Sequence, residues 1–231
     1  MNATKVYKSI ESALNTFQTG SDEYKVMSFY LRELMDECKA EIAASALAGN
    51  TKDIYKSALA FATKCRKKNW ESRPALAGAF IMDDGKQAIC DGYTLAVYDT
   101  PFDALPMMDT KNNKPLDVKA ILNFKCDARG ILPEVQTLRA AFKTAKLAHT
   151  GKDKFIHYTK IETPFCDVAI WFNTELLIQA MELAGSRNFE YVSLNARNAI
   201  KIIGDGTLVL RMPIAKMADD YNSGYVHTLA A

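Results

Sequence analysis

The chain has 231 residues, a length that suits one large domain or two small ones. Hydrophobic residues make up 48% of the chain and charged residues 24%, a composition that is typical of folded proteins and argues against a disordered chain. The formal net charge of +2 is too small to indicate a nucleic-acid partner by itself. No apolar stretch approaches the roughly 20 residues of a membrane-spanning helix, so we expect no membrane partner.

The N-terminus lacks the apolar core and cleavage site of a secretory signal, which favours a cytoplasmic protein. The cysteines fit this location, because they are odd in number, dispersed and without a C-x-x-C pair. We therefore expect reduced, buried thiols and no structural zinc site. The five residues are Cys38, Cys65, Cys90, Cys126 and Cys166.

Residues 1–50 are interpreted as an N-terminal helical extension. Apolar residues recur at three- and four-residue spacing over 21–47, which predicts one long amphipathic helix ending before Gly49. Thr51 is expected to cap a second helix, with Ile54 and Ala58 on its apolar face. This second helix is also basic, and its lysines lie mostly on other faces: Lys56, Lys64, Lys67 and Lys68.

Three short strands joined by tight turns come next. The pattern predicts strands at 76–81, 87–90 and 94–98, with Asp-Asp-Gly and Asp-Gly at the turns. Residues 99–167 then connect the two halves of the chain. Four prolines between 99 and 133 predict a mostly irregular connection across the surface, with one strand at 120–124.

A second basic amphipathic helix is predicted at 134–148, with Arg139, Lys143 and Lys146 on its polar side. Beyond it, the pattern indicates a strand at 168–172 and a helix at 174–184 closed by Gly185. Three more strands are expected, at 191–194, 199–203 and 208–212.

The order helix-β-β-β over 53–98 returns as β-helix-β-β-β over 168–215, which indicates an internal repeat. The predicted fold class is therefore α+β: one domain over 51–231, built from two β-α-β-β-β units. Its sheets are expected to be antiparallel, with the helices on one face.

Few residues suggest catalysis. His149, His157 and His227 stand in no metal-ligand pattern, and the glycines around Asp205 precede no helix that would cradle a phosphate. We expect no metal and no cofactor. Cys90 has no histidine placed by sequence to activate it, so a buried structural cysteine is the preferred interpretation.

Four stretches carry a more specific pattern. Arg73-Pro74-Ala75-Leu76-Ala77-Gly78 is followed by a turn and then by Asp91-Gly92-Tyr93-Thr94-Leu95-Ala96. In the second half, Phe172-Asn173-Thr174-Glu175-Leu176-Leu177 enters a helix and Met212-Pro213-Ile214 ends a strand. Together they resemble the bacterial DNA sliding clamp family, the beta subunit of the replicative DNA polymerase, whose domains carry R-P-x-L-x-G, D-G-[HY]-R-L-A and M-P-[ML].

The resemblance implies a protein that binds and does not catalyse. Its outer surface would take short peptide motifs of polymerases and other clamp-binding proteins, although Thr94 stands where the family usually has Arg. The peptide-binding residues that it implies are Gly92, Tyr93, Thr94, Leu95, Met212, Pro213, Ile214 and Tyr221.

The resemblance also implies a basic, helix-lined inner surface that slides on duplex DNA. The candidate DNA-binding residues are Lys56, Lys64, Lys67, Lys68, Arg139, Lys143 and Lys146. The helix at 174–184 departs from this lining, since it carries Glu175 and Glu182 and no Lys or Arg. A clamp chain holds three such domains and closes as a dimer, so a ring of this chain would take an oligomer of about six copies.

Three alternatives stay open. One is a clamp-fold docking module that binds proteins and no DNA. Another is an enzyme with an unrecognised site near Cys90 and Asp91. The third makes the apolar stripe of the N-terminal helix, which includes Met27, Tyr30 and Leu34, a dimerisation or partner-binding element.

Overall fold

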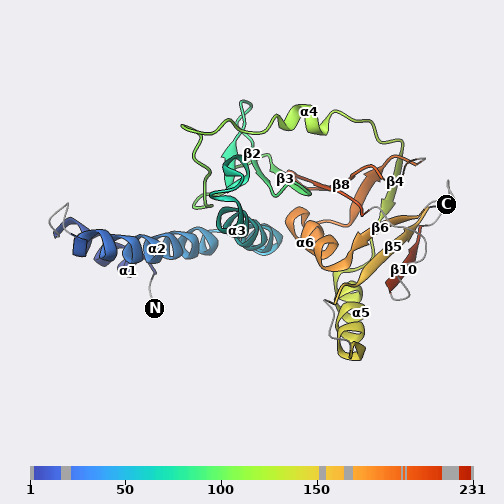
Figure 1. Ribbon diagram of the computed structural model, residues 1–231, viewed down its shortest axis with the longest axis horizontal. Coiled ribbons are helices and arrows are strands. Elements are labelled where there is room, and N and C mark those ends of the chain that lie inside the picture. The colour runs from blue at the N-terminus through green and yellow to red at the C-terminus, as the bar shows by residue number, and fades with distance from the viewer. Residues whose placement is uncertain are drawn as a thin grey trace.

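The computed structural model describes residues 3–16, 22–150, 155–163, 169–193, 195, 197–214 and 224–229. Its helices are α1 (Ala3–Thr16), α2 (Asp22–Ser45), α3 (Gly49–Asn69), the short 3-10 helix η1 (Pro74–Leu76), α4 (Val118–Leu122), α5 (Val135–Ala148) and α6 (Thr174–Ala184). Its strands are β1 (Ala79–Ile81), β2 (Gln87–Cys90), β3 (Thr94–Tyr98), β4 (Ala128–Ile131), β5 (Tyr158–Glu162), β6 (Ile170–Asn173), β7 (Asn188–Tyr191), β8 (Ile200–Gly204), β9 (Thr207–Arg211) and β10 (Gly224–Thr228). Figure 1 shows their arrangement.

A seven-stranded antiparallel sheet, in the order β1-β2-β3-β9-β8-β7-β4, forms the centre of the protein. At its middle β3 pairs with β9, with Thr94 opposite Arg211 and Tyr98 opposite Thr207. The order β3-β2-β1 on one side matches β9-β8-β7 on the other. The two units predicted as a repeat therefore meet where β3 pairs with β9. The predicted α+β fold class is confirmed.

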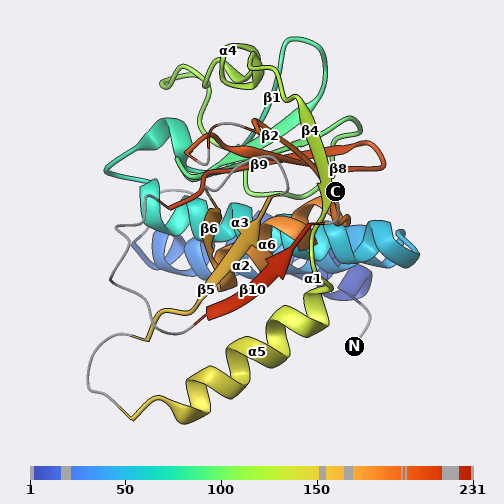
Figure 2. The ribbon, with the colours of Figure 1, turned by 90° about the vertical axis from the view of Figure 1, so that its right-hand side faces the viewer.

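A smaller sheet has the order β10-β5-β6 and lies beside α5 (Figure 2). In it β5 runs antiparallel to β6 and parallel to β10. The prediction placed a strand near β6 but none at β4, β5 or β10. These strands pair with strands that are distant in the sequence. The sequence therefore contains no hairpin turn that would predict them.

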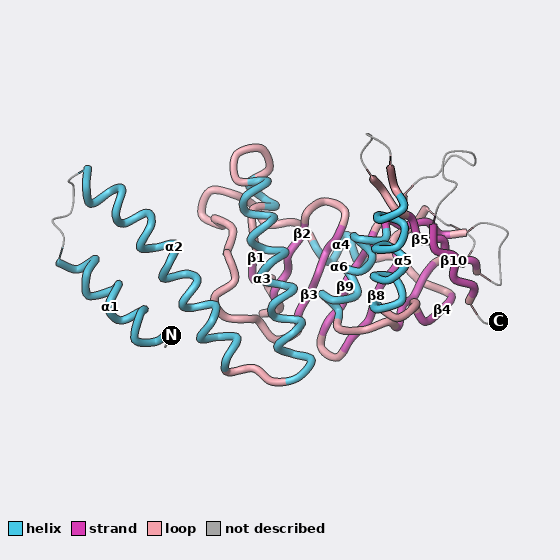
Figure 3. The backbone as a smooth tube through the Cα atoms, turned by 90° about the horizontal axis from the view of Figure 1, so that it is seen from below, coloured by secondary structure: helices cyan, strands magenta, loops and turns pink. Residues whose placement is uncertain are grey.

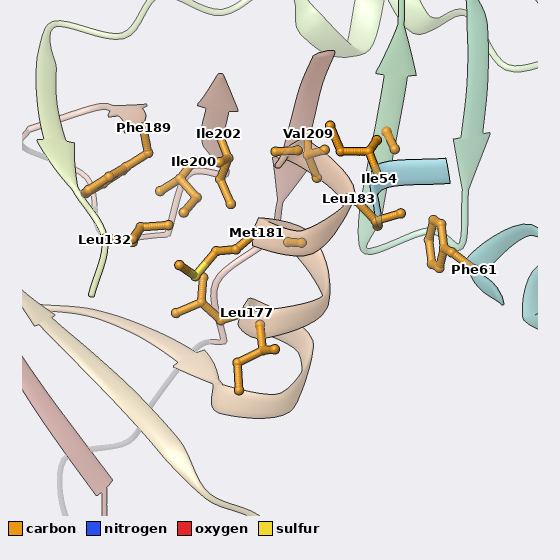
Figure 4. Close-up of a cluster of buried hydrophobic side chains, with 14 of the residues drawn as sticks. Ile54, Phe61, Leu132, Leu177, Met181, Leu183, Phe189, Ile200, Ile202 and Val209 are labelled. Atoms are coloured by element: carbon orange, nitrogen blue, oxygen red, sulfur yellow. The ribbon is translucent and has the colours of Figure 1, made fainter. Parts of the chain in front are cut away.

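Helices α3 and α6 pack against each other and against one face of the large sheet, as the repeat predicts. Their apolar sides meet strand residues such as Ile200 and Val209 in the main core (Figure 4). Helix α6 has the predicted bounds because both ends are capped. Asn173 accepts a hydrogen bond from the backbone N–H of Leu176 at 3.2 Å, and Gly185 adopts a left-handed conformation.

The connection between the two units departs from the prediction. Residues 106–124, here called the strap, cover the other face of the sheet and do not wander over the surface. The expected strand at 120–124 is wrong, because this segment forms α4, whose N-terminus is capped by the Asp117 carboxylate. Met108 and Val118 of the strap are buried with Phe80 and Leu95 in a second apolar cluster.

The strap has to cover this face because strands β1 to β3 are apolar on both sides. Along β3, Ala96 and Tyr98 face the helices while Leu95 and Val97 face the strap. Lys201 holds the far end of the strap, since its Nζ donates to the carbonyl oxygens of Leu122 at 3.1 Å and Phe124 at 2.7 Å.

The N-terminal segment forms a hairpin of α1 and α2 that extends away from the sheet (Figure 1). The sequence pattern predicted α2 but not α1. The second predicted helix, α3, begins before Thr51 with Ala48 at the cap position, so the expected Thr51 cap is wrong. The predicted strand at 76–81 is shorter, because Pro74–Leu76 forms a 3-10 turn.

The β8–β9 hairpin supplies a first test of the packing. A side chain at Gly204 would overlap the backbone carbonyl oxygen of Ala184 and the hydroxyl of Thr207. We expect Gly204→Ala to lower the free energy of unfolding by about 3 kcal/mol, measured by urea denaturation, because backbone of α6 cannot move aside. Gly206→Ala is the matched control, since the nearest atom lies 3.8 Å away and only its positive φ adds strain, about 1 kcal/mol. Equal losses for the two variants would contradict this packing.

Candidate functional site

The turn over residues 91–95, here called the docking turn, is fixed by its own hydrogen bonds. The Asp91 carboxylate Oδ1 accepts from the backbone N–H groups of Tyr93 at 2.9 Å and Thr94 at 2.8 Å. Gly92 has a φ of +94°, a conformation that favours glycine. The Asp-Gly pair therefore sets the turn, and it leaves the Tyr93 side chain 59% exposed.

Residues 212–214, the predicted closing strand, lie directly against this turn. The backbone N–H of Met212 donates to the carbonyl oxygen of Tyr93 at 3.0 Å, and that of Ile214 donates to Trp171 at 2.9 Å. The Met212 side chain is 39% exposed. The fold thus brings together two exposed apolar side chains, Tyr93 and Met212, from opposite halves of the chain.

The other predicted peptide-binding residues have different positions. Thr94 and Leu95 are buried, so they support the turn and present no side chain at the surface. Pro213 and Ile214 are half-buried in the segment that follows β9, so the predicted strand ends before them. Tyr221 lies outside the described residues.

Arg211 is a residue of this site that the sequence analysis missed. It is only 3% exposed, and its Nη1 donates to the Thr94 hydroxyl at 2.6 Å across the β3–β9 ladder. Its Nε has no hydrogen-bond partner within the described part of the chain. Burial lowers the pKa of the guanidinium, and the nearby Asp91 carboxylate opposes that shift. The signal available in the sequence was Thr94, which stands at the family's usual Arg position.

The predicted DNA-binding residues lie on two helices that flank α6. Helix α6 packs against α3 on one side and α5 on the other, and Figure 3 views the molecule from this helical side. The predicted residues of α3 are exposed: Lys56, Lys64, Lys67 and Lys68. The predicted residues of α5 are exposed too: Arg139, Lys143 and Lys146.

The charge on this helical side is partly neutralised. Arg139 forms an ion pair with Glu182 of α6, and Lys56 lies 3.6 Å from Asp53 within α3. Lys64 and Arg139 line a groove of about 460 Å³ along α6, together with Glu175 and Gln179. A basic side therefore exists, with an acidic helix at its middle.

A larger cleft of about 1270 Å³ lies between the strap and the ends of the β1–β2 and β8–β9 hairpins. Its walls mix apolar Ile81 and Ile203 with charged residues of both signs, such as Asp117 and Lys119. Neither this cleft nor the groove along α6 includes a residue of the docking turn. The docking turn therefore lies outside both of these cavities, with the Tyr93 side chain exposed.

The Cys90 thiol is unsuited to nucleophilic catalysis. It is buried, and burial raises its pKa, so the reactive thiolate is disfavoured. The histidines make their described contacts elsewhere: His157 with Thr174, His149 with Phe155, and His227 with the carbonyl of Ile131. Within the described ranges no three His, Cys, Asp or Glu residues gather as metal ligands would.

None of the helices that the structure describes has both the length and the apolar character needed to cross a membrane.

The central sheet with paired helix-strand units defines an α+β protein. No family model matches the sequence. No curated protein matches it either.

Solved structures that are similar to this chain include bacterial sliding clamps. The beta subunit of DNA polymerase from Streptococcus pyogenes is 14% identical with a TM-score of 0.49, over 77% of this chain and 65% of that one. The DNA polymerase III beta sliding clamp from Bartonella birtlesii, bound to griselimycin, is 14% identical with a TM-score of 0.49, over 71% and 65%. The DNA polymerase III beta subunit from Pseudomonas aeruginosa is 13% identical with a TM-score of 0.45, over 63% and 60%.

The matched regions span less than two thirds of each of these clamps. The likeness to these three structures concerns the fold alone.

Proposed function

We propose that this chain is a non-enzymatic, clamp-like accessory protein of DNA replication or repair that binds a short apolar peptide of a polymerase-type partner. The observation that supports this function best is the exposed pair of Tyr93 and Met212, joined by a backbone hydrogen bond. The motifs around both residues are those on which the clamp resemblance depends. The domain division expected from the sequence, 1–50 and 51–231, is part of the same proposal.

The physical case rests on rigidity and exposure. Tyr93 stands on the docking turn and Met212 directly follows β9, and hydrogen bonds hold both in place. An aromatic side chain and a flexible methionine on a rigid support make a low-entropy contact for an apolar peptide. Exposed apolar side chains that cluster in this way are typical of recognition surfaces.

We expect an apolar peptide containing Leu and Phe to shift the backbone amide resonances of Tyr93 and Met212. Tyr93→Ala should weaken its binding about tenfold or more, measured by isothermal titration calorimetry, because an aromatic anchor is lost. Trp70→Ala, which removes an aromatic side chain that is 55% exposed at the end of α3, should leave the affinity unchanged. Equal affinities for the wild type and Tyr93→Ala would remove the docking turn from the proposal.

A second function, binding to duplex DNA, is favoured by the basic sides of α3 and α5. Five predicted cations stand outside the ion pairs of Lys56 and Arg139: Lys64, Lys67, Lys68, Lys143 and Lys146. Such residues track phosphates without reading bases, so binding would be independent of sequence and sensitive to salt. A docking module without DNA binding is the competing outcome.

Two other hypotheses receive less support. An enzyme centred on Cys90 would need a thiolate, which burial opposes. On the α1–α2 hairpin, Met27, Tyr30 and Leu34 are exposed, as a partner-binding stripe requires. Nothing else in the structure identifies what would cover that stripe.

A further inference from the structure

His157 is a buried titratable side chain that neither of the proposed binding surfaces uses. It is 4% exposed and directly precedes β5. It contacts Thr174 twice: its backbone carbonyl oxygen accepts from the Thr174 N–H at 2.9 Å, and its ring Nδ1 lies 2.8 Å from the Thr174 hydroxyl. Because Thr174 is the first residue of α6, the imidazole ring lies at the N-terminus of that helix.

Two buried hydroxyl groups suit the uncharged form of this ring. The Thr174 hydroxyl lies 2.9 Å from the Thr159 hydroxyl of β5, and both threonines are 0% exposed. A neutral imidazole has one donor and one acceptor nitrogen, so it completes this chain of hydroxyl groups without bringing a charge into the interior. The neutral ring therefore joins β5 to α6.

Aromatic side chains connect the same ring to α5. The ring centroid of Phe142, on α5, lies 6.1 Å from that of His157 and 5.5 Å from that of Phe155. Phe155 in turn stacks on His157, with ring centroids 6.4 Å apart. His157 thus lies where α5, β5 and α6 meet, at a place here called the α5–α6 junction.

The charged groups around the α5–α6 junction give His157 no carboxylate partner. The acidic, basic and histidine side chains of the elements packed here are Arg139, Lys143, Lys146 and His149 at α5, Lys160 and Glu162 on β5, Glu175 and Glu182 on α6, and His227 on β10. Within the described part of the chain none of them forms an ion pair with His157. The carboxylates are engaged or exposed: Glu182 pairs with Arg139, Glu162 pairs with Lys160, and Glu175 faces water.

A proton on His157 would therefore place a charge in an unfavourable position. Lys146 lies 5.9 Å from the Phe142 ring centroid, and His149 contacts Phe155, so the other groups at these rings are basic. The N-terminus of α6 carries the positive end of the helix dipole, which also disfavours a cation. Burial lowers the pKa of His157 below its ordinary value of 6.5.

We propose that His157 is a pH-sensitive switch that keeps α5 packed on α6 at neutral pH and releases it in mildly acidic solution. The folded chain takes up this proton less readily than the unfolded chain does. The packing is therefore fully stable above about pH 6.5 and weakens as the pH falls below that value. Because α5 carries Arg139, Lys143 and Lys146, its release would also move part of the basic side of the molecule.

Hydrogen exchange of the full chain at about pH 7.5 and about pH 5.5 tests the switch, because histidines are the side chains that change charge in this range. With exchange expressed as protection, which removes the intrinsic effect of pH, protection of the α5 amides should fall about tenfold at the lower pH. Protection of the α3 amides should stay unchanged, since α3 does not contact the junction.

His157→Asn keeps a polar group near the position of Nδ1 but does not titrate, so the protection of α5 in this variant should be the same at both pH values. This readout is a dependence on pH and does not require the variant to be as stable as the wild type. His149→Asn is the matched control. His149 belongs to the same aromatic group but is exposed, so this variant should keep the wild-type fall in protection.

Three outcomes would overturn the switch: equal protection of α5 at both pH values in the wild type, a fall that persists in His157→Asn, or an equal fall in α3. The ring resonances of His157 in the wild type give a measurement that needs no variant. They should titrate below pH 6.5, and titration at or above that value would also overturn the proposal. Peptide and DNA binding at neutral pH are separate measurements, so the switch and the proposed function can fail independently.

Discussion

Leu177→Ala is expected to lower the free energy of unfolding by about 3–5 kcal/mol, the upper range for a fully buried leucine. The Leu177 side chain has 0% exposure and lies in the main core, on the side of α6 that faces the sheets (Figure 4). Helix α6 contacts α3, α5 and strands of both sheets, so no single neighbour can shift to refill the space. The loss would be measured as a lower urea midpoint at unchanged slope.

The same chain supplies a matched control for this substitution. Leu147 near the end of α5 is 78% exposed, so Leu147→Ala removes the same atoms from a site already in water. Its effect should stay within about 0.5 kcal/mol. A loss at Leu147 comparable to that at Leu177 would show that α6 is not the centre of the core.

The second large effect concerns DNA. Five lysines of α3 and α5 form no ion pair within the described part of the chain: Lys64, Lys67, Lys68, Lys143 and Lys146. If they contact phosphates, the logarithm of the binding constant should fall with the logarithm of salt concentration at a slope of about −4 to −5. Neutralising Lys64, Lys67 and Lys68 together with Gln should reduce the slope by about 3 and the affinity about a hundredfold at about 0.1 M salt. Fluorescence anisotropy with a labelled duplex measures both quantities.

The control for net charge lies on the opposite face of the sheet. Lys111, Lys114 and Lys119 are exposed on the strap, and replacing these three with Gln changes the total charge by the same amount. This variant should keep the wild-type slope, because its lysines lie away from α3 and α5. Equal effects of the two triple variants would mean that DNA responds only to net charge. Light scattering on the same samples separates a closed oligomer from a monomer that binds on its surface.

The repeat of helix and strands was predictable because its signals are local. Asp-Gly turns bound β2 and β3, and Asn173 and Gly185 bound α6, so each of these elements matches the prediction. The α+β fold class follows from the order of these elements. The sequence analysis missed helix α4 because its apolar residues pack on a face of the sheet. That face exists only once the sheet has formed.

Half of the candidate site could be read from the motifs. The sequence analysis identified the Asp91–Gly92 turn and the Met212–Pro213 strand as separate features, and the structure joins them by a backbone hydrogen bond. It did not predict that Thr94 and Leu95 would be buried, since their exposure depends on the strap and on the opposite strand. The sequence analysis also could not predict that Glu182 would neutralise Arg139 of the basic helix α5. Their ion pair forms only when α5 packs on α6.

The sequence by itself determined the α+β class, the paired units, the fixed turn and the positive charge on two helices, because short-range periodicity and turn chemistry encode them. Only the tertiary structure decided which side chains meet. Arg211 and Thr94 are 117 residues apart in the chain, and the β3–β9 register places them side by side. That register depends on the burial of both strand faces, a property of the assembled sheet and not of either strand alone.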